Sequence, residues 1–255
     1  MSLIYSFSDS RYHAWATCVF SVAMTAVVVL SLISLYIPNR ASSNVCRISF
    51  TPMIPLPTGS GSITVKAADF NNDRFLDLIV TNYDGDTTSI FLGYGNGGFK
   101  KQIDLLNGLG AKPLGIASGD INKVNQLDIA VANRNTRIGS TPVGLALDDF
   151  NNDSILDLVV TDHENGRLVV YFGTDAGTFT EKAVLVTGHR ARPYLVITHD
   201  FNKDHRLDIA VGDGDGNNLG IFLGNGTGSF SDQMTYKTQS GSFALAAADF
   251  NRDDN

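Results

Sequence analysis

The sequence is poor in residues on which several common protein classes depend. Of its 255 residues only 2 are cysteine and 1 is tryptophan. Two cysteines cannot build the disulfide framework that holds many small secreted domains together. Lys and Arg number 19 against 26 Asp and Glu, and the cationic residues are not clustered. We therefore expect no nucleic-acid partner, because phosphate backbones are held by grouped Lys and Arg.

The sequence also lacks the short motifs that mark common catalytic sites. Its 5 histidines are scattered without a His-x-x-x-His pair, and it has neither a Gly-x-Ser-x-Gly motif nor a phosphate-binding Gly-Lys loop. We therefore expect no enzyme activity, and we assign no catalytic residue and no organic cofactor.

One long apolar run lies near the N-terminus. Residues 14–37 contain no charged side chain, and a helix of this length can cross a hydrocarbon core of about 30 Å. Trp15 and Tyr36 lie near its ends, where membrane-interface aromatics are common. We predict an N-terminal tail over residues 1–13 and a single transmembrane helix over residues 14–37 that acts as a signal anchor. A cleaved signal peptide is the alternative, and it would make the protein secreted.

The rest of the chain is a linker followed by repeats. Residues 38–61 contain several Pro, Gly and Ser and are predicted to form an extended linker. The repeated strings are DFNNDRFLDLIV, DINKVNQLDIAV, DFNNDSILDLVV and DFNKDHRLDIAV, which begin at Asp69, Asp120, Asp149 and Asp200, and DFNRDDN from Asp249 starts a fifth. The starts are 51, 29, 51 and 49 residues apart. A period near 50 residues indicates propeller blades or a β-solenoid over residues 62–255.

Each full unit carries signals for four short strands. Apolar runs such as ITVKAA and LDLIV, bounded by Gly, Asn and Asp, favour buried strands over helices. Gly-rich hairpins follow, and they end at Phe99, Phe179 and Phe230. Four antiparallel strands per unit is the make-up of a propeller blade. The Asp120 unit lacks this hairpin, so we expect it to form half a blade.

The paired Phe-Gly and Gly-x-x-Phe hairpins, together with the Asp-x-Asn-x-Asp loops, resemble FG-GAP repeats, also called VCBS-type repeats. The resemblance runs from Ser62 to Asn255. It implies an all-β, calcium-binding β-propeller like the head of integrin alpha chains, used in adhesion and ligand binding. Closed rings of this family have about seven blades. The chain is therefore either a fragment or an open, partial propeller with exposed sheet edges.

The Asp-rich loops have the residue spacing of a calcium site. Oxygen-bearing side chains recur at positions one, three, five and nine of a loop, and position seven supplies a backbone carbonyl. Calcium takes about six to eight oxygen ligands, and grouped carboxylates repel one another without a cation. The predicted ligands are Asp69, Asn71, Asp73, Phe75 and Asp77 in one loop, Asp149, Asn151, Asp153, Ile155 and Asp157 in the next, and Asp200, Asn202, Asp204, Arg206 and Asp208 in the third.

Other interpretations of these loops are an EF-hand and a metal-free turn. An EF-hand is excluded because its twelfth position requires Glu, whereas Val80, Val160 and Val211 stand there. An Asx-turn, in which Asp and Asn cap backbone N–H groups without a metal, remains the alternative. The Asp120 loop has Val124 at position five and is expected to bind calcium weakly or not at all.

These observations predict a membrane-anchored, calcium-binding repeat protein whose repeat domain is extracellular or lumenal, where calcium is abundant. Its expected partner is an extracellular protein or carbohydrate, bound through the propeller surface. The alternative is an accessory propeller of a larger secreted or membrane hydrolase acting on carbohydrate or lipid. Self-association through open sheet edges or through Cys46 is also expected.

Overall fold

The computed structural model describes residues 2–9, 12–19, 55–134, 141–188, 191–239, 241–242 and 244–248. These residues contain β-strands and no helix. The strands are β1 (Ser2–Asp9), β2 (Tyr12–Val19), β3 (Ser62–Ala68), β4 (Asp77–Asn82), β5 (Thr87–Phe91), β6 (Ile103–Leu106), β7 (Pro113–Gly119), β8 (Asp128–Asn133), β9 (Pro142–Asp148), β10 (Asp157–Asp162), β11 (Arg167–Gly173), β12 (Phe179–Val186), β13 (Pro193–His199), β14 (Asp208–Asp213), β15 (Asn218–Phe222) and β16 (Met234–Lys237).

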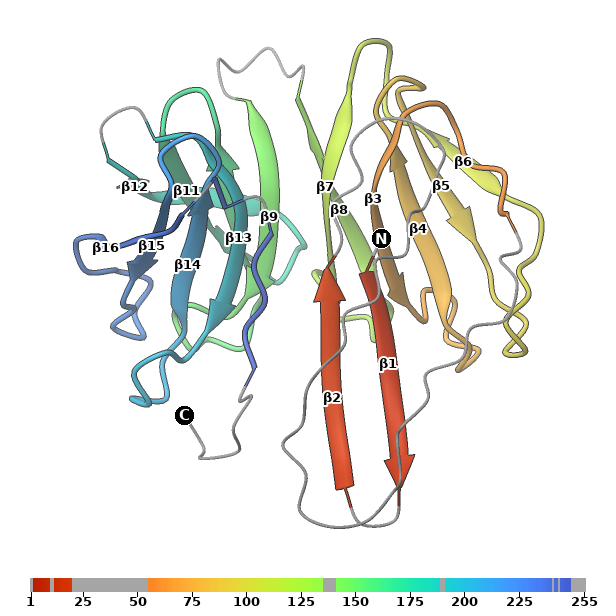
Figure 1. Ribbon diagram of the computed structural model, residues 1–255, viewed down its shortest axis with the longest axis horizontal. Coiled ribbons are helices and arrows are strands. Elements are labelled where there is room, and N and C mark those ends of the chain that lie inside the picture. The colour runs from red at the N-terminus through yellow and green to blue at the C-terminus, as the bar shows by residue number, and fades with distance from the viewer. Residues whose placement is uncertain are drawn as a thin grey trace.

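Consecutive strands pair antiparallel into separate small sheets (Figure 1). Strands β3–β6, β9–β12 and β13–β16 each form a four-stranded sheet, whereas β7 and β8 form a two-stranded one. Strand β9 begins at Pro142, nine residues after β8 ends at Asn133, so the chain has no room there for two more strands. The half blade expected of the Asp120 unit is therefore confirmed.

The first strand of each sheet lies at the centre of the array. Strand β7 contacts β3 and β9, and β9 contacts β13. In Figure 1 the outer strands β6 and β12 accordingly lie on opposite sides of the molecule. The described sheets form an open, propeller-like array. The predicted strand positions are confirmed, since the inner strands β3, β7, β9 and β13 all lead directly into an Asp-rich loop.

Neighbouring inner strands approach closely because glycine lines the contact. A Cβ added to Gly115 would lie 2.3 Å from the Val143 carbonyl oxygen, and one on Gly144 would lie 2.5 Å from the Tyr194 carbonyl oxygen. The Thr161 hydroxyl donates a hydrogen bond to the same Tyr194 oxygen at 3.3 Å. The equivalent Thr81 hydroxyl donates to the Leu114 oxygen at 2.9 Å. Close backbone contacts and hydrogen bonds from threonine hydroxyls therefore join successive sheets.

Apolar side chains fill the space between sheets. Counted along the repeats, the first sheet is β3–β6, the second β7–β8, the third β9–β12 and the fourth β13–β16. The larger cluster lies between the third and fourth sheets and contains Val159, Leu168, Ile209 and Phe222. Phe150, the second residue of an Asp-rich loop, is 2% exposed and belongs to this cluster. This loop is therefore anchored in the core by the residue that follows its first aspartate.

The N-terminal segment differs from the prediction. Strand β2 pairs antiparallel with β1, with Asp9 opposite Tyr12 and Ser2 opposite Val19, so residues 14–19 are strand where a helix was predicted. Aromatic and β-branched residues are frequent in Tyr12–Val19, and such residues favour strands. The described residues contain no helix long and apolar enough to cross a bilayer. The transmembrane helix over residues 14–37 is therefore not supported, and its residues 20–37 lie outside the described part.

Two further predictions concern residues that are largely outside the described part. Cys46 lies there, as does the linker from residue 38 to residue 54. The last linker residues belong to the first sheet, because the Gly61 and Ser60 carbonyl oxygens accept the N–H groups of Tyr83 and Gly85 at 2.9 and 3.0 Å.

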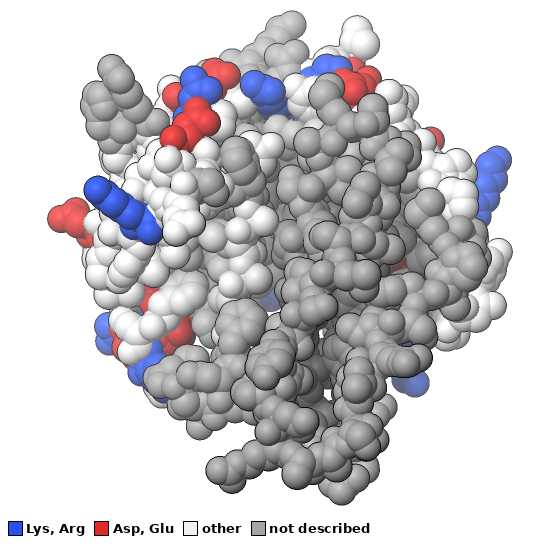
Figure 2. Space-filling model, viewed as in Figure 1, with Lys and Arg blue, Asp and Glu red and all other residues white. Residues whose placement is uncertain are grey.

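Charged side chains of both signs share the described surface. On the face shown in Figure 2, Lys and Arg lie among Asp and Glu around the periphery, and the described part of this face shows no large patch of one sign. This distribution agrees with the absence of clustered cations in the sequence.

Candidate functional site

Each Asp-rich loop joins the first strand of a sheet to the second and has the same backbone form. Positions four and six adopt left-handed angles, with φ between 57° and 68°, at Asn72, Arg74, Lys123, Asn125, Asn152, Ser154, Lys203 and His205. Such angles are uncommon for residues other than glycine. The loops therefore need specific contacts to hold them.

The side chains at positions one, three and five supply these contacts. In the first loop, Asp69 accepts the N–H groups of Asp73 at 3.1 Å and of Arg74 at 2.6 Å. Asn71 Oδ1 accepts the Asp73 N–H at 3.0 Å, and Asp73 Oδ1 accepts the Phe75 N–H at 2.9 Å. Each is an Asx-type contact, in which a side-chain oxygen binds a backbone N–H a few residues on.

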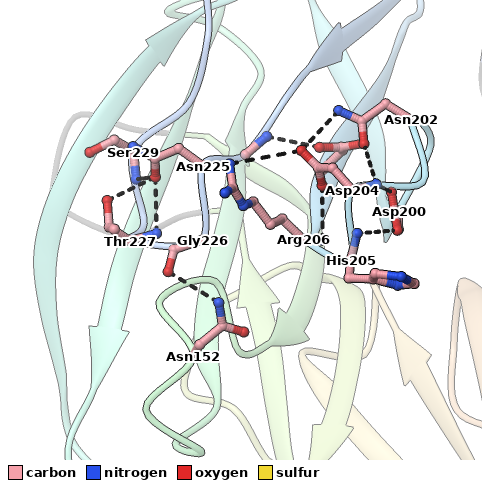
Figure 3. Close-up of polar contacts among 12 residues, drawn as sticks. Asn152, Asp200, Asn202, Asp204, His205, Arg206, Asn225, Gly226, Thr227 and Ser229 are labelled. Carbon is pink, nitrogen blue, oxygen red and sulfur yellow. Dashed lines mark hydrogen bonds and ion pairs between the residues drawn. The ribbon is translucent and has the colours of Figure 1, made fainter.

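The other two complete loops repeat this network. Asp149 and Asp200 accept the N–H groups of the residues at positions five and six. Figure 3 shows this arrangement around Asp200, with Asn202 and Asp204 facing each other. The distance from the amide nitrogen at position three to the carboxylate at position five is 3.0, 2.9 and 3.1 Å in the three loops. The structure therefore brings together the residues predicted at positions one, three and five.

Position nine has a different environment from the one expected of an open metal ligand. Asp77 is completely buried. Its Oδ2 accepts the Phe70 N–H at 3.0 Å and its Oδ1 accepts the Gly93 N–H at 2.8 Å. The pairs made by Asp157 and Asp208 are equivalent, and each joins its loop to the Phe-Gly strand end of the same sheet.

Sequence reasoning missed this bridging role, although a signal was present. The glycine that donates to each ninth-position carboxylate stands 16 residues later in every full unit. In the Asp120 unit Asp128 accepts the Ile121 N–H at 3.0 Å, but the hairpin with its glycine is missing. The ninth-position carboxylate and this glycine therefore act together to join the loop to the third strand of a full unit.

The seventh position is held by its backbone N–H. In the three loops the carboxylate at position five accepts this N–H at 2.8 to 2.9 Å, from Phe75, Ile155 and Arg206. The side chain of Arg206 also approaches Asp204, with Nη1 at 4.0 Å from Oδ2. The predicted carbonyl ligand thus lies on a residue whose backbone is fixed by its own loop.

Burial and like charge act together on Asp157. The pKa of this carboxyl is raised to about 6, chiefly by burial and further by the negative charges of Asp153 and Asp149, while the N–H groups of Gly173 and Phe150 act in the opposite direction. The third sheet therefore holds three carboxylates that repel one another electrostatically.

At Asp200, burial raises the carboxyl pKa by less than backbone N–H groups together lower it. Burial alone would raise the pKa of this carboxyl, but N–H groups from His205, Asp204, Lys203 and Asn202 together bring it below its usual value. The first carboxylate of this loop is therefore kept ionised by the turn itself.

The Asp120 loop shows which side chains the turn requires, because it has no carboxylate at position five. Asp120 accepts the N–H groups of Val124 at 2.9 Å and Asn125 at 2.8 Å, and Asn122 also accepts the Val124 N–H at 3.2 Å. The loop thus keeps its form with valine at position five. The carboxylates of Asp73, Asp153 and Asp204 are consequently not needed for the shape.

The donor set of the complete loops fits a hard cation that accepts mixed oxygens. Within the described ranges, no three Asp, Glu, His or Cys side chains form a metal-binding group by themselves. A cation at a loop would therefore take amide and carbonyl oxygens as well as carboxylates. Calcium accepts this mixture, whereas zinc sites are usually built from Cys, His and carboxylate side chains.

The loops also contact the next unit (Figure 3). Asn152 Nδ2 donates to the Gly226 carbonyl oxygen at 3.2 Å, and the Gly228 N–H donates to the Phe150 oxygen at 2.9 Å. Where the hairpin is missing, Asn72 Nδ2 instead donates to the Asn125 oxygen at 3.0 Å. The end of the array that carries the loops is therefore a continuous set of loop and hairpin contacts.

Two solved structures have a distant likeness to the chain. BBS1N in complex with ARL6DN, from a crystal soaked with mercury, has 15% identity and a TM-score of 0.44, over 72% of this chain and 55% of that one. A catalytically inactive virginiamycin B lyase from Staphylococcus aureus with quinupristin has 19% identity and a TM-score of 0.45, over 68% and 55%. The chain thus spans about half the length of either structure.

Comparison at the level of sequence families is more specific. No curated protein matches the chain. The FG-GAP-like repeat family matches residues 69–131, 149–211 and 200–255, which together are more than half of the chain and include each complete Asp-rich loop. The chain therefore belongs to the FG-GAP-like repeat family.

Proposed function

We propose that this chain is a non-enzymatic binding module in which calcium, bound at the Asp-rich loops, stabilises each complete sheet. The observation that carries the proposal is the contrast between the loops. The Asp120 loop keeps its form with Val124 at position five, yet every loop of a four-stranded sheet has a carboxylate there. The carboxylate at position five is not needed for the shape of the loop, yet it recurs in every four-stranded sheet. Binding of a ligand explains this recurrence.

A cation at the loop would stabilise the sheet in two ways. It would relieve the repulsion among Asp149, Asp153 and Asp157, which raises the pKa of Asp157. It would also hold the loop against the second strand, because Asp157 is the first residue of β10. We therefore assign the metal a structural role. We assign the binding of a partner to the surface of the sheets.

The proposed environment is extracellular or lumenal. Weak extracellular calcium modules have dissociation constants of about 10⁻⁴ to 10⁻³ M and are occupied at the calcium concentrations found there. Adhesion or capture of an extracellular ligand is the function that such a module would serve.

The proposal is tested by neutralising one carboxylate at a time in the full chain. An Asp153→Asn variant keeps the oxygen that accepts the Ile155 N–H, so the loop can keep its form, but it loses the charge. We expect calcium to raise the melting temperature of this variant less than that of the original chain, because one site is weakened. Asp120→Asn is the matched control, and its calcium response should equal that of the original chain.

The reverse substitution makes the test sharper. A Val124→Asp variant completes positions one, three and five of the Asp120 loop, and we expect it to add calcium-dependent stabilisation. If Asp153→Asn and Asp120→Asn change the calcium response equally, the carboxylate at position five is not a ligand and the proposal is wrong.

A further inference from the structure

A polar cavity of about 810 Å³ lies between the third and fourth sheets. Its wall includes Glu164, from the turn between β10 and β11, and Asp215, from the turn between β14 and β15. The Asp-rich loops stand at the other ends of β10 and β14. The cavity and the candidate calcium loops are therefore at opposite ends of the same strands.

The wall of the cavity contains a buried carboxylate without a cation. Asp213, the last residue of β14, is 8% exposed. Its Oδ1 accepts the N–H groups of Arg192 at 2.9 Å and Asp215 at 3.2 Å. The Arg192 guanidinium is directed to Asp215, with Nε at 3.3 Å from Oδ2. Among the described residues, the ion pairs thus leave Asp213 without a positive partner.

The third sheet has a carboxylate at the position equivalent to Asp213, and there it has a cationic partner. Asp162 is the last residue of β10, the position that Asp213 occupies in β14. Arg167 Nε lies 2.8 Å from Asp162 Oδ2, and Asn165 Nδ2 donates to both of its oxygens at 3.0 and 2.8 Å. The repeat thus already places a guanidinium on this carboxylate in one of its sheets.

The fourth sheet has lost both partners. Three and five residues after Asp213 stand Gly216 and Asn218, where Asn165 and Arg167 stand after Asp162. A Cβ on Gly216 would lie 1.8 Å from Asp213 Oδ2, so the glycine leaves the room that this carboxylate occupies. The site of the missing guanidinium is open to the cavity, because Asn218 lines it.

An independent observation concerns Thr187. This residue is 6% exposed and lines the same cavity. Within the described residues, its hydroxyl is the one buried side-chain oxygen or nitrogen that lacks a hydrogen-bond partner. A buried polar atom without a partner is unfavourable, so a ligand that forms a hydrogen bond with it would bind more tightly.

We propose that this cavity binds a guanidinium group, as presented by an arginine residue of a partner peptide, with Asp213 as its anionic partner and Thr187 as a hydrogen-bonding neighbour. A guanidinium has five N–H donors in a planar fork that matches a carboxylate. Glu164 adds negative charge to the wall, whereas Arg192, the one cation among the described residues of the wall, is paired with Asp215. An anionic ligand is therefore disfavoured.

The inference rests on the proposed role as a binding module and names the ligand chemistry of one site. It is independent of calcium, because the loops lie at the other ends of the strands. Binding should therefore be measured both with saturating calcium and with excess chelator. Arginine binding without any calcium response would sustain this inference while the calcium proposal fails.

The experiment is a titration of the full chain, followed by NMR or calorimetry, with N-acetyl-arginine amide. Its neutral isostere N-acetyl-citrulline amide is the matched ligand control, and agmatine carries the guanidinium without peptide groups. We expect the arginine compound to bind at least tenfold more tightly than the citrulline compound. Agmatine binding as tightly as the arginine compound would identify a free guanidinium compound as the source, whereas weaker binding would favour a peptide.

Two variants locate the site. Asp213→Asn keeps the acceptor for the Arg192 N–H but removes the charge, and it should lower the affinity at least tenfold while the melting temperature changes little. Asp175 is an exposed carboxylate in the hairpin of the third sheet, and it forms an ion pair with Lys123 of the Asp120 loop. An Asp175→Asn variant removes the same charge and should bind the arginine compound as the original chain does. Equal binding of arginine and citrulline compounds, or unchanged binding by Asp213→Asn, would overturn the inference.

Discussion

At the scale of single residues, the carboxylates of one Asp-rich loop have different roles according to their position. The first aspartate binds two backbone N–H groups and forms the turn. The fifth makes one such bond and leaves Oδ2 facing an asparagine amide. The ninth is buried and joins the loop to the strand that follows. The fifth can be lost without loss of the turn, as Val124 demonstrates.

Spacing alone could predict part of this arrangement. Positions one, three and five were expected to converge because a tight loop brings alternate side chains to one side, and the structure places them so. The role of Asp77 could not be derived in that way. Its donors are the backbone N–H groups of Phe70 and Gly93, so the spacing of side chains within the loop does not reveal them, and the one sequence signal is the glycine 16 residues later.

A second carboxylate at the residue scale leads to a prediction about pH. Burial by itself would raise the pKa of Asp162, but hydrogen bonds from Asn165, Arg167 and the Thr141 N–H, together with the Arg167 charge, hold it below its usual value. A carboxyl with a lowered folded-state pKa contributes stability above its unfolded pKa, and this contribution is lost as the pH falls through the folded value.

We therefore expect acid to destabilise the original chain more steeply than an Asp162→Asn variant below about pH 4, where unfolded-state Asp residues begin to bind protons. The measurement is urea denaturation at a series of pH values between neutral and strongly acidic. Parallel pH profiles for the two proteins would show that Asp162 is not held ionised by its partners.

At the scale of the structural elements, the Phe-Gly hairpin depends on glycine for steric reasons. A Cβ on Gly173 would lie 2.2 Å from the Leu156 carbonyl oxygen, and the equivalent distance is 2.3 Å at Gly93 and 2.1 Å at Gly224. The three hairpins thus press against the backbone just before the ninth-position aspartate. The same glycines donate the N–H groups that these aspartates accept.

A Gly173→Ala variant should therefore be destabilised by about 1–3 kcal/mol, the usual cost of forcing extra atoms into a packed site. The control is Gly98→Ala, because a Cβ there meets a side-chain oxygen at 3.1 Å and no backbone atom. The free energy of unfolding in urea measures both changes. If the two variants lose equal stability, the close approach at Gly173 is not what requires glycine.

The N-terminal elements concern a prediction that the structure does not support. An uncharged run over residues 14–37 satisfies the length rule for a membrane helix, but length and hydropathy do not report pairing with another segment. Strand β1 pairs with β2 over its whole length, and this partner lies outside the run. The repeat strands were predicted correctly because several copies of the same pattern, each bounded by turn residues, support one another.

At the scale of the whole molecule, the sheets are joined in series and each contacts mainly its neighbours. In such arrays stability is approximately a sum of contributions from the units and their interfaces. Calcium at the complete loops would therefore stabilise the array one sheet at a time. We expect the loop of the β7–β8 sheet to bind a metal most weakly, because the Val124 side chain has no oxygen. This sheet contacts its neighbours through β3 and β9.

The central claim is that the complete loops bind calcium, and calorimetric titration of the full chain with calcium tests it most directly. The account predicts about three bound ions, with dissociation constants of about 10⁻⁴ to 10⁻³ M, and a rise in melting temperature that grows with calcium concentration. Absence of binding heat together with an unchanged melting temperature at 10-fold higher calcium, about 10⁻² M, would contradict the claim and leave the loops as metal-free Asx-turns.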